Sequence, residues 1–358
     1  MPKLAIAVGA LASSVPHLLR SERSVDRQVS AAFGALLVSF VVSILATGPS
    51  PTILWGSEAR ADGLICAVVG LLVFAAASRS GSWLLPWWIG GLTVAAVYAL
   101  VQKLGLDPVP WGIDHVPALT YRPFATLGSP SFLAIGLAMG LPALLLWSGR
   151  WWAVMLGMVF AVALLLTMSR AGIAAGVVGL SLAGLGTGQR PRAAFVGAVV
   201  LGLVLGAVWS GVGAPTSTAR RFEADGGSAR VRVELAASGL RALASSPAVG
   251  IGPGATAEWL ASDRRANLTD HQRRNPSFHN WLLDAGAQRG ILGLFATLWL
   301  VLAAGAVARG PLAGTLAAFL IGVSFGFPTT ATWLAACMLL GVVSSRPGAG
   351  STPRSPTC

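Results

Sequence analysis

Three groups of polar residues in this chain have side chains that can bind an anion or move a proton. The first is Arg170, which stands in the stretch 166–172 between two long apolar runs. Arginine offers a planar fork of donors that fits phosphate oxygens, and a cation at the edge of an apolar layer is costly without water or an anionic partner. Arg170 alone therefore fits either an anchor to lipid headgroups or a phosphate clamp.

The second group lies in one long polar segment. Arg230 and Arg232 alternate with apolar residues, and Arg241 follows Arg230 by eleven residues. Eleven residues make about three helical turns, so Arg230 and Arg241 can share one helix face. The alternative is a solvated face, on which Arg232 pairs with Glu234 or with another carboxylate.

The third group is His279 with its neighbour Asn280. Imidazole titrates near neutral pH and is the commonest general base, and Asn280 can fix the ring tautomer or bind a hydroxyl. The alternative is a helix cap or a hydrogen-bonded structural residue. His279 stands where a long loop re-enters an apolar run, unlike the other three histidines, which are His17, His115 and His271.

Metal or cofactor chemistry finds little support in the residue spacing. No pair of histidines or carboxylates shows the spacing of metal ligands, and the Asp107, Asp114 and His115 group is more simply a polar loop. Three cysteines cannot form a disulfide framework. Neither a P-loop nor a serine-hydrolase signature occurs, so we expect no metal and no cofactor.

The elements that position these residues are apolar. The 358 residues are 54% hydrophobic and 11% charged, whereas soluble domains carry about 25% charged residues. Long apolar runs, several near the ~20 residues that cross a bilayer, predict an all-α, polytopic membrane bundle. Spans are expected at 28–47, 61–77, 83–101, 128–147, 151–167, 171–188, 193–211, 288–308, 311–327 and 331–345, with a weak or re-entrant one at 4–19.

Arginine placement predicts the orientation of these spans. Short connectors rich in arginine belong on the cytoplasmic side, and every second connector carries one, including Arg79, Arg150 and Arg309. The remaining connectors, 48–60, 102–127, 212–287 and the turn at 327–330, are then extracytoplasmic. The net charge of +12 follows from this scatter and forms no stripe for nucleic acid.

We therefore expect four regions along the chain. N-terminal membrane helices occupy 1–211, an extracytoplasmic arginine-rich loop 212–287, C-terminal membrane helices 288–345, and a disordered tail 346–358. A connector as long as 212–287 is usually functional or disordered. Its helical stretch, 229–244, and the glycine-rich run at 250–254 indicate a folded cap that lies on the membrane.

Several motifs, taken in order, resemble those of the O-antigen ligase and polymerase family of bacterial membrane glycosyltransferases. The turn at 167–172 resembles the family's T-x-S-R-[AG] element, 247–254 its P-x-x-G-x-G-x-G segment, and 279–294 its HN-x-x-L…G-x-x-G-L element. Shorter pieces at 54–63 and 126–130 also resemble family members. The similarity covers about residues 30–345, although Ser129-Pro130-Ser131 stands where many members have Asn-Pro-Asn.

The resemblance implies a GT-C-like, metal-independent, inverting enzyme of the cytoplasmic membrane, with its site on the extracytoplasmic side. Its donor is a glycan on undecaprenyl diphosphate, and its acceptor is a hydroxyl of a lipid, protein or glycan. By resemblance, His279 is the base and Arg170, Arg230 and Arg232 bind the diphosphate. Asn280 and Arg241 support them.

Two other functions remain compatible with the residues. A transporter or permease would use the long loop as a gate and Arg170 as a ligand, although few charged residues lie mid-span, where transporters bind substrate. A non-catalytic partner in polysaccharide assembly would not need Arg170 or His279. Ligase and polymerase differ only in the acceptor, which no residue pattern names.

Overall fold

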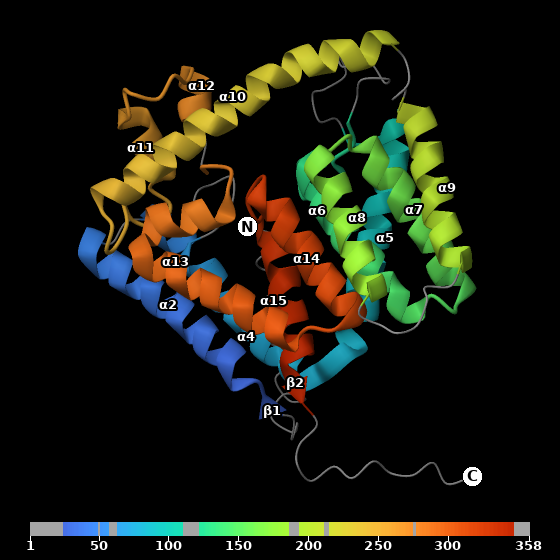
Figure 1. Ribbon diagram of the computed structural model, residues 1–358, viewed down its shortest axis with the longest axis horizontal. Coiled ribbons are helices and arrows are strands. Elements are labelled where there is room, and N and C mark those ends of the chain that lie inside the picture. The colour runs from blue at the N-terminus through green and yellow to red at the C-terminus, as the bar shows by residue number, and fades with distance from the viewer. Residues whose placement is uncertain are drawn as a thin grey trace.

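The computed structural model describes residues 24–48, 51–56, 63–109, 122–185, 193–210, 215–274 and 277–346 (Figure 1). The expected run at 4–19 and all but the first residue of the expected tail lie outside these ranges. The described helices are α2 (Arg27–Thr47), α3 (Pro51–Trp55), α4 (Leu64–Ser80), α5 (Leu84–Lys103), α6 (Pro130–Leu144), α7 (Trp151–Leu166), α8 (Arg170–Leu185), α9 (Ala193–Ser210), α10 (Pro215–Ser245), α11 (Thr256–Ser262), α12 (Asp270–Arg273), α13 (Trp281–Val307), α14 (Gly310–Ser324) and α15 (Thr330–Ser344).

The all-α polytopic bundle is confirmed, and each of the ten runs from 28–47 to 331–345 corresponds to an apolar helix. Within the described ranges, four helical segments are long and apolar enough to cross a membrane: α2, the stretch Leu64–Lys103, the stretch Pro130–Trp147 and α13. Five shorter apolar helices, of 10–17 residues, accompany them. A 16-residue helix rises about 24 Å, somewhat less than the ~30 Å hydrocarbon core.

Small residues bring the apolar helices into close contact. A side chain on Gly179 of α8 or on Gly314 of α14 would overlap the backbone carbonyl of the other helix. Gly341 of α15 meets the carbonyl of Phe74 in α4 in the same way. Such approaches hold membrane helices together, because lipid gives no hydrophobic force between them.

Large apolar side chains cover the outside of the bundle. Leu45 of α2, Trp87 of α5 and Val208 of α9 are 80%, 71% and 76% exposed. So many exposed large apolar side chains would be unusual on a soluble monomer. The outside of these helices is therefore the lipid-facing surface of a membrane protein.

The two ends of the bundle differ. At one end the two-residue strands β1 (Ser24–Val25) and β2 (Ser345–Arg346) pair antiparallel. Figure 1 shows the connectors α4–α5, α6–α7 and α13–α14 at this same end. Arg79 stands in the last turn of α4, and Arg150 and Arg309 stand in the other two connectors, so these three arginines lie at one end of the bundle.

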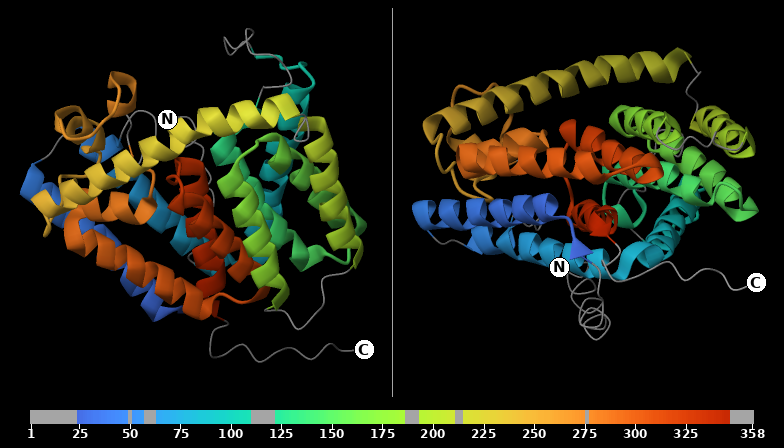
Figure 2. Two further views of the ribbon diagram at one scale, coloured as in Figure 1. Left: turned by 45° about the horizontal axis from the view of Figure 1, so that its top comes forward. Right: turned by 60° about the horizontal axis from the view of Figure 1, so that its bottom comes forward.

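The other end carries α10, which crosses over the bundle from the end of α9 to α11 and α13 (Figure 2). This helix has 31 residues, whereas the sequence predicted a helix only over 229–244. The additional turns contain Gly226 and Gly227 and few apolar residues. Neither periodicity nor propensity indicates a helix there.

Candidate functional site

His279 lies in a strained turn that precedes α13. Its φ is +58°, a left-handed conformation that non-glycine residues seldom adopt and that often occurs at functional sites. The carboxylate of Asp284, only 4% exposed, accepts hydrogen bonds from the Phe278 N–H at 2.8 Å and the Ser277 hydroxyl at 2.7 Å. The Ser277 hydroxyl in turn accepts the His279 N–H at 2.8 Å. Asp284 therefore holds the turn that presents the imidazole.

Asn280 is the N-cap of α13. Its Oδ1 accepts the Leu283 N–H at 3.0 Å, and its Nδ2 donates to the Ser324 carbonyl at the end of α14, also at 3.0 Å. Both the oxygen and the nitrogen of the Asn280 side-chain amide are therefore hydrogen-bonded to backbone groups. Asn280 fixes the start of α13 against α14.

Two aromatic contacts connect His279 to α6. The imidazole meets the Phe327 ring edge-on, with centroids 5.6 Å apart and an interplanar angle of 61°. Phe327 meets Phe132, in the first turn of α6, with centroids 5.2 Å apart. His279 is therefore two ring contacts from the beginning of α6.

Arg170 is the first residue of α8 and is exposed. Ser169 caps this helix, because its hydroxyl accepts the Gly172 N–H at 3.3 Å. Met168, just before, has a φ of +51°. Free N–H groups and the helix dipole make a helix N-terminus favourable for an anion, and Arg170 adds a full positive charge there.

The Arg170 turn also lies against α6. A side chain on Gly172 would overlap Ala134, which lies two residues after Phe132. The structure thus brings Arg170 and His279 to the same end of the bundle, each beside the first turns of α6. The sequence alone could not show that Arg170 and His279 lie at the same end, because more than a hundred residues separate them.

Arg122 is a further cation at this end that the sequence reasoning missed. Its Nε donates to the Thr167 carbonyl at 2.7 Å, so Arg122 lies beside the turn that carries Arg170. Among described residues, the non-glycine positions with positive φ are Ala125, Met168 and His279. Ala125 is three residues from Arg122, Met168 is two residues from Arg170, and the third position is His279 itself. The sequence could have singled out Arg122 because it is an arginine on the connector 102–127, which is expected to be extracytoplasmic and where arginine is less common.

Arg230 and Arg232 are exposed on α10. Within the part of the chain that the structure describes, neither has an ion-pair partner, and the Glu234 carboxylate accepts the Asn267 N–H at 3.3 Å. Leu235, one turn after Arg232, is buried in a cluster with Phe278 and Ala287. This contact places α10 directly over the His279 turn.

Arg241 has a different environment. Its guanidinium forms an ion pair with Asp263 at 2.7 Å. The Ser238 hydroxyl donates to the same carboxylate at 2.5 Å and accepts the Trp259 indole N–H at 3.1 Å. Burial of Asp263 raises its pKa, but the hydrogen bonds from Ser238 and Arg241 outweigh burial, and the pKa is lowered overall. Arg241 thus joins α10 to the end of α11.

The glycine-rich segment Pro247–Gly254 docks on a break in α13. Gly290, with a φ of +66°, interrupts that helix. The carbonyls freed at Ala287 and Gln288 accept the N–H groups of Ile251 and Gly252, at 2.9 and 3.1 Å. The glycines therefore permit close backbone contact between loop and helix.

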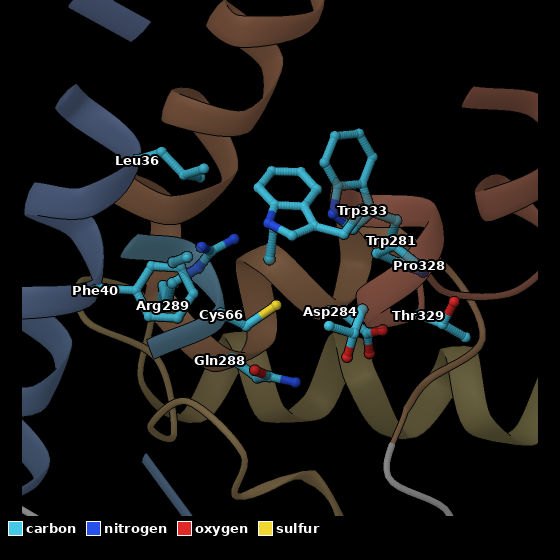
Figure 3. A pocket seen from close by; sticks show the side chains of 13 residues that line it. Leu36, Phe40, Cys66, Trp281, Asp284, Gln288, Arg289, Pro328, Thr329 and Trp333 are labelled. Atoms are coloured by element: carbon cyan, nitrogen blue, oxygen red, sulfur yellow. The ribbon is translucent and has the colours of Figure 1, made fainter. Parts of the chain in front are cut away.

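Beside His279 lies a pocket with a cavity volume of about 70 Å³ (Figure 3). It is lined by the buried side chains of Gln288 and Arg289, which begin the expected span 288–308 and were not predicted as site residues. The guanidinium carbon of Arg289 lies 4.3 Å from the centroid of Phe40. The lining residues are Leu36, Phe40, Cys66, Ala67, Trp281, Asp284, Ala285, Gln288, Arg289, Pro328, Thr329, Thr330 and Trp333.

Fold and site together define a polytopic all-α membrane protein with a histidine and several arginines at one end. Among the residues described, no group of three or more histidine, cysteine or acidic side chains could hold a metal ion.

Residues 153–298 match the family model of O-antigen ligases. This region runs from α7 into α13 and includes Arg170, Arg230, Arg232 and His279. No curated protein sequence matches the chain. The match over residues 153–298 confirms the resemblance to O-antigen ligases.

Proposed function

We propose that this O-antigen ligase-like membrane glycosyltransferase moves a glycan from undecaprenyl diphosphate to an acceptor hydroxyl. The observation that carries the proposal is the placement of the Arg170 turn and the strained His279 turn beside the same first turns of α6. One turn offers a cation and a helix N-terminus, and the other offers a base. Transfer from a lipid diphosphate needs both.

The diphosphate is the leaving group and gains negative charge as its bond to the sugar breaks. Arg170, with the N-terminal N–H groups of α8, binds its oxygens. Arg230 and Arg232 approach from α10. Charge-assisted hydrogen bonds from arginine to phosphate are frequently bidentate and strong. Donors aimed at developing charge stabilise the transition state more than the ground state.

His279 acts on the acceptor. Its imidazole takes the hydroxyl proton while the hydroxyl oxygen forms a bond to the anomeric carbon. The bond between that carbon and the phosphate oxygen breaks on the opposite face, so the configuration inverts and the diphosphate leaves with the electron pair. General-base help of this kind contributes about 10²–10⁴-fold in rate.

The site belongs on the extracytoplasmic side of the cytoplasmic membrane. This orientation is supported by the arginine-bearing connectors, which lie at the opposite end of the bundle from α10. Short connectors with excess arginine face the cytoplasm. A carrier-linked glycan would then reach the site from the outer leaflet.

The test uses His279→Ala and Arg170→Ala in the native host, with Trp87→Ala on the lipid-facing surface of α5 as control. Both site variants should shorten or abolish the surface glycan and accumulate carrier-linked intermediates at normal protein level. Trp87→Ala should change neither. Normal glycans and normal intermediates in both site variants would refute the enzymatic proposal.

A further inference from the structure

A cavity of about 290 Å³ lies between α5, α6 and α15. Each helix turns one face toward it, because the lining residues on each helix are mostly three or four positions apart, the spacing of one helix face. The 3₁₀ helix Ala125–Leu127, which precedes α6, also lines the cavity through Thr126 and Leu127. The longest of the three helix faces is that of α5, with Trp88, Gly91, Leu92 and Ala95.

Small residues keep this cavity open. Five of the eleven described residues that line it are glycine or alanine. Nothing in the described structure lies within 4 Å of a Cβ added to Gly91, whereas a side chain on Gly179 of α8 would overlap the carbonyl of Gly314. Close approach through small residues is the usual way in which membrane helices associate. Here the small residues of α5, α6 and α15 instead leave a space that another molecule can fill.

The lining suits a hydrocarbon chain. Among the described lining residues none is charged, and two carry a hydroxyl, Thr126 and Thr332. The Thr332 hydroxyl donates to the Thr329 carbonyl at 3.2 Å within the cap of α15. A sugar or a lipid headgroup would lose its hydrogen bonds to water here. An apolar cavity of about 150 Å³ binds benzene, which has six carbons. The cavity of about 290 Å³ therefore has room for roughly two five-carbon isoprene units.

The cavity opens on the lipid-facing side of α5. Gly91 lines the cavity and is itself exposed. Trp87 and Val94, which lie on the same face of α5 at helical spacing, are 71% and 66% exposed. This stretch of α5 is therefore both a wall of the cavity and part of the lipid-facing surface. A hydrocarbon chain can enter from the bilayer without crossing a polar layer.

The cavity begins one helical turn along α6 from the ring pair that contacts His279. Gly136, which lines the cavity, follows Phe132 by four residues and lies on the same face of α6. Ala331, which lines it from α15, follows Phe327 by four residues. Phe132 and Phe327 meet with centroids 5.2 Å apart, and Phe327 contacts the imidazole. One turn along α6 thus leads from the ring pair to the cavity.

The cavity is also close along the chain to the Arg170 turn. Thr126 follows Arg122 by four residues, and Arg122 donates to the Thr167 carbonyl in the turn that carries Arg170. Four residues span at most about 14 Å. The cavity therefore adjoins the part of α6 beside which both the proposed base and the Arg170 turn lie.

We propose that this cavity binds the isoprene units of the donor carrier that adjoin its diphosphate. The inference rests on the proposed function, which places the diphosphate at Arg170 and the anomeric carbon in front of His279. In such a donor only the two phosphate groups separate the anomeric carbon from the prenyl chain, so the chain must begin beside the site. The acyl chain of a phospholipid, or the lipid part of an acceptor, has no fixed distance from the reacting atoms. A hydrocarbon cavity at this place therefore fits the carrier.

Two adjacent glycines of α5 allow a matched test. Gly90 and Gly91 are both exposed, and at both positions an added Cβ would meet nothing described within 4 Å. Of the two, only Gly91 lines the cavity. Gly91→Leu therefore fills part of the cavity, whereas Gly90→Leu places the same side chain outside it. Gel filtration checks that both variants are folded, and Gly91→Val replaces Gly91→Leu if that protein does not accumulate.

Binding is measured by calorimetry on purified protein in phosphatidylcholine nanodiscs. The probes are geranyl diphosphate, which has two isoprene units, and inorganic diphosphate, which has none. Wild type should bind geranyl diphosphate more tightly than inorganic diphosphate. Gly91→Leu should weaken binding of geranyl diphosphate about tenfold, because the leucine excludes roughly one isoprene unit, and should leave binding of inorganic diphosphate unchanged. Gly90→Leu should bind both probes as wild type does.

The outcomes separate the chain site from the diphosphate site. Wild type that binds the two probes equally overturns the inference, and membrane lipid then fills the cavity. Gly91→Leu that binds geranyl diphosphate as tightly as wild type overturns it as well. Arg170→Ala should weaken both probes; if it weakens neither, the proposed function is contradicted and the chain site stands. Wild type that binds neither probe contradicts both.

Glycan transfer in proteoliposomes gives a second readout. With a full-length carrier-linked donor, Gly91→Leu should raise the donor KM about tenfold relative to Gly90→Leu and leave the acceptor KM unchanged. An acceptor KM that rises instead would place the lipid part of the acceptor in the cavity. That result overturns the inference and leaves the transfer function standing.

Discussion

The imidazole of His279 meets the ring of Phe327 edge-on, with centroids 5.6 Å apart. Phe327 also meets Phe132 of α6, so one ring joins the base to the helix beside which Arg170 lies. Replacing Phe327 with alanine should let the imidazole turn away from the acceptor. We expect kcat to fall about tenfold or more, since small displacements of a catalytic group are costly, with little change in the donor KM.

The conservative variant Phe327→Tyr keeps the aromatic edge contact and should retain most of the activity. The measurement is glycan transfer in proteoliposomes at saturating donor. A donor KM that rises while kcat stays constant would place Phe327 in donor binding and contradict the positioning role.

Asp284 should be the second positioning residue of the His279 turn. Asp284→Asn places an amide N–H where the carboxylate now accepts from Phe278 or Ser277. A buried group left without its partner costs about 1–3 kcal/mol, and the left-handed His279 turn would relax. We expect a lower kcat at normal protein level. Ser277→Ala should also lower kcat, because it removes both the donor to Asp284 and the acceptor of the His279 N–H.

The fold could be predicted from sequence because its signal is local. Each apolar run is long enough to be recognised by itself, and arginine marks alternate connectors, so α2 and α4 to α9 appear near their observed bounds. The break at Gly290 could not be predicted from the apolar run. It depends on a backbone contact with Pro247–Gly254, about forty residues earlier.

Residues of the candidate site could be predicted only where a side chain able to bind an anion or move a proton also stands at the end of an apolar run. His279 and Arg170 stand at the ends of apolar runs, where a polar residue is conspicuous. Asp284 stands four residues before the expected start of the span 288–308, and Arg289 is the second residue of that span. Their roles depend on Ser277 and on Phe40, which the expected spans do not link to them. Such tertiary partners leave no local pattern.

Gly290→Ala should prevent the loop from docking. A side chain at Gly290 would overlap the carbonyl of Ala248, and its φ of +66° is strained for alanine. We expect a large loss of folded protein after detergent extraction, measured by gel filtration. The matched control is Gly197→Ala in α9, where nothing lies within 4 Å of an added Cβ. Equal recovery of the two variants would show that docking on the α13 break is dispensable.

The Arg241–Asp263 pair should make the stability of the loop depend on pH. The pKa of Asp263 is lowered in the folded protein: burial raises it, but hydrogen bonds from Ser238 and Arg241 prevail. A carboxyl with a lowered folded pKa stabilises the fold above its unfolded pKa, about 3.9, and this stability is lost as pH falls through the folded value. Asp263→Asn should therefore destabilise the protein near neutral pH by about 1–3 kcal/mol. The difference from wild type should shrink below pH 4, as measured by thermal unfolding of the extramembrane loop. A difference that stays constant between neutral pH and pH 3 would mean that the carboxylate charge contributes nothing to the attachment of α10 to α11.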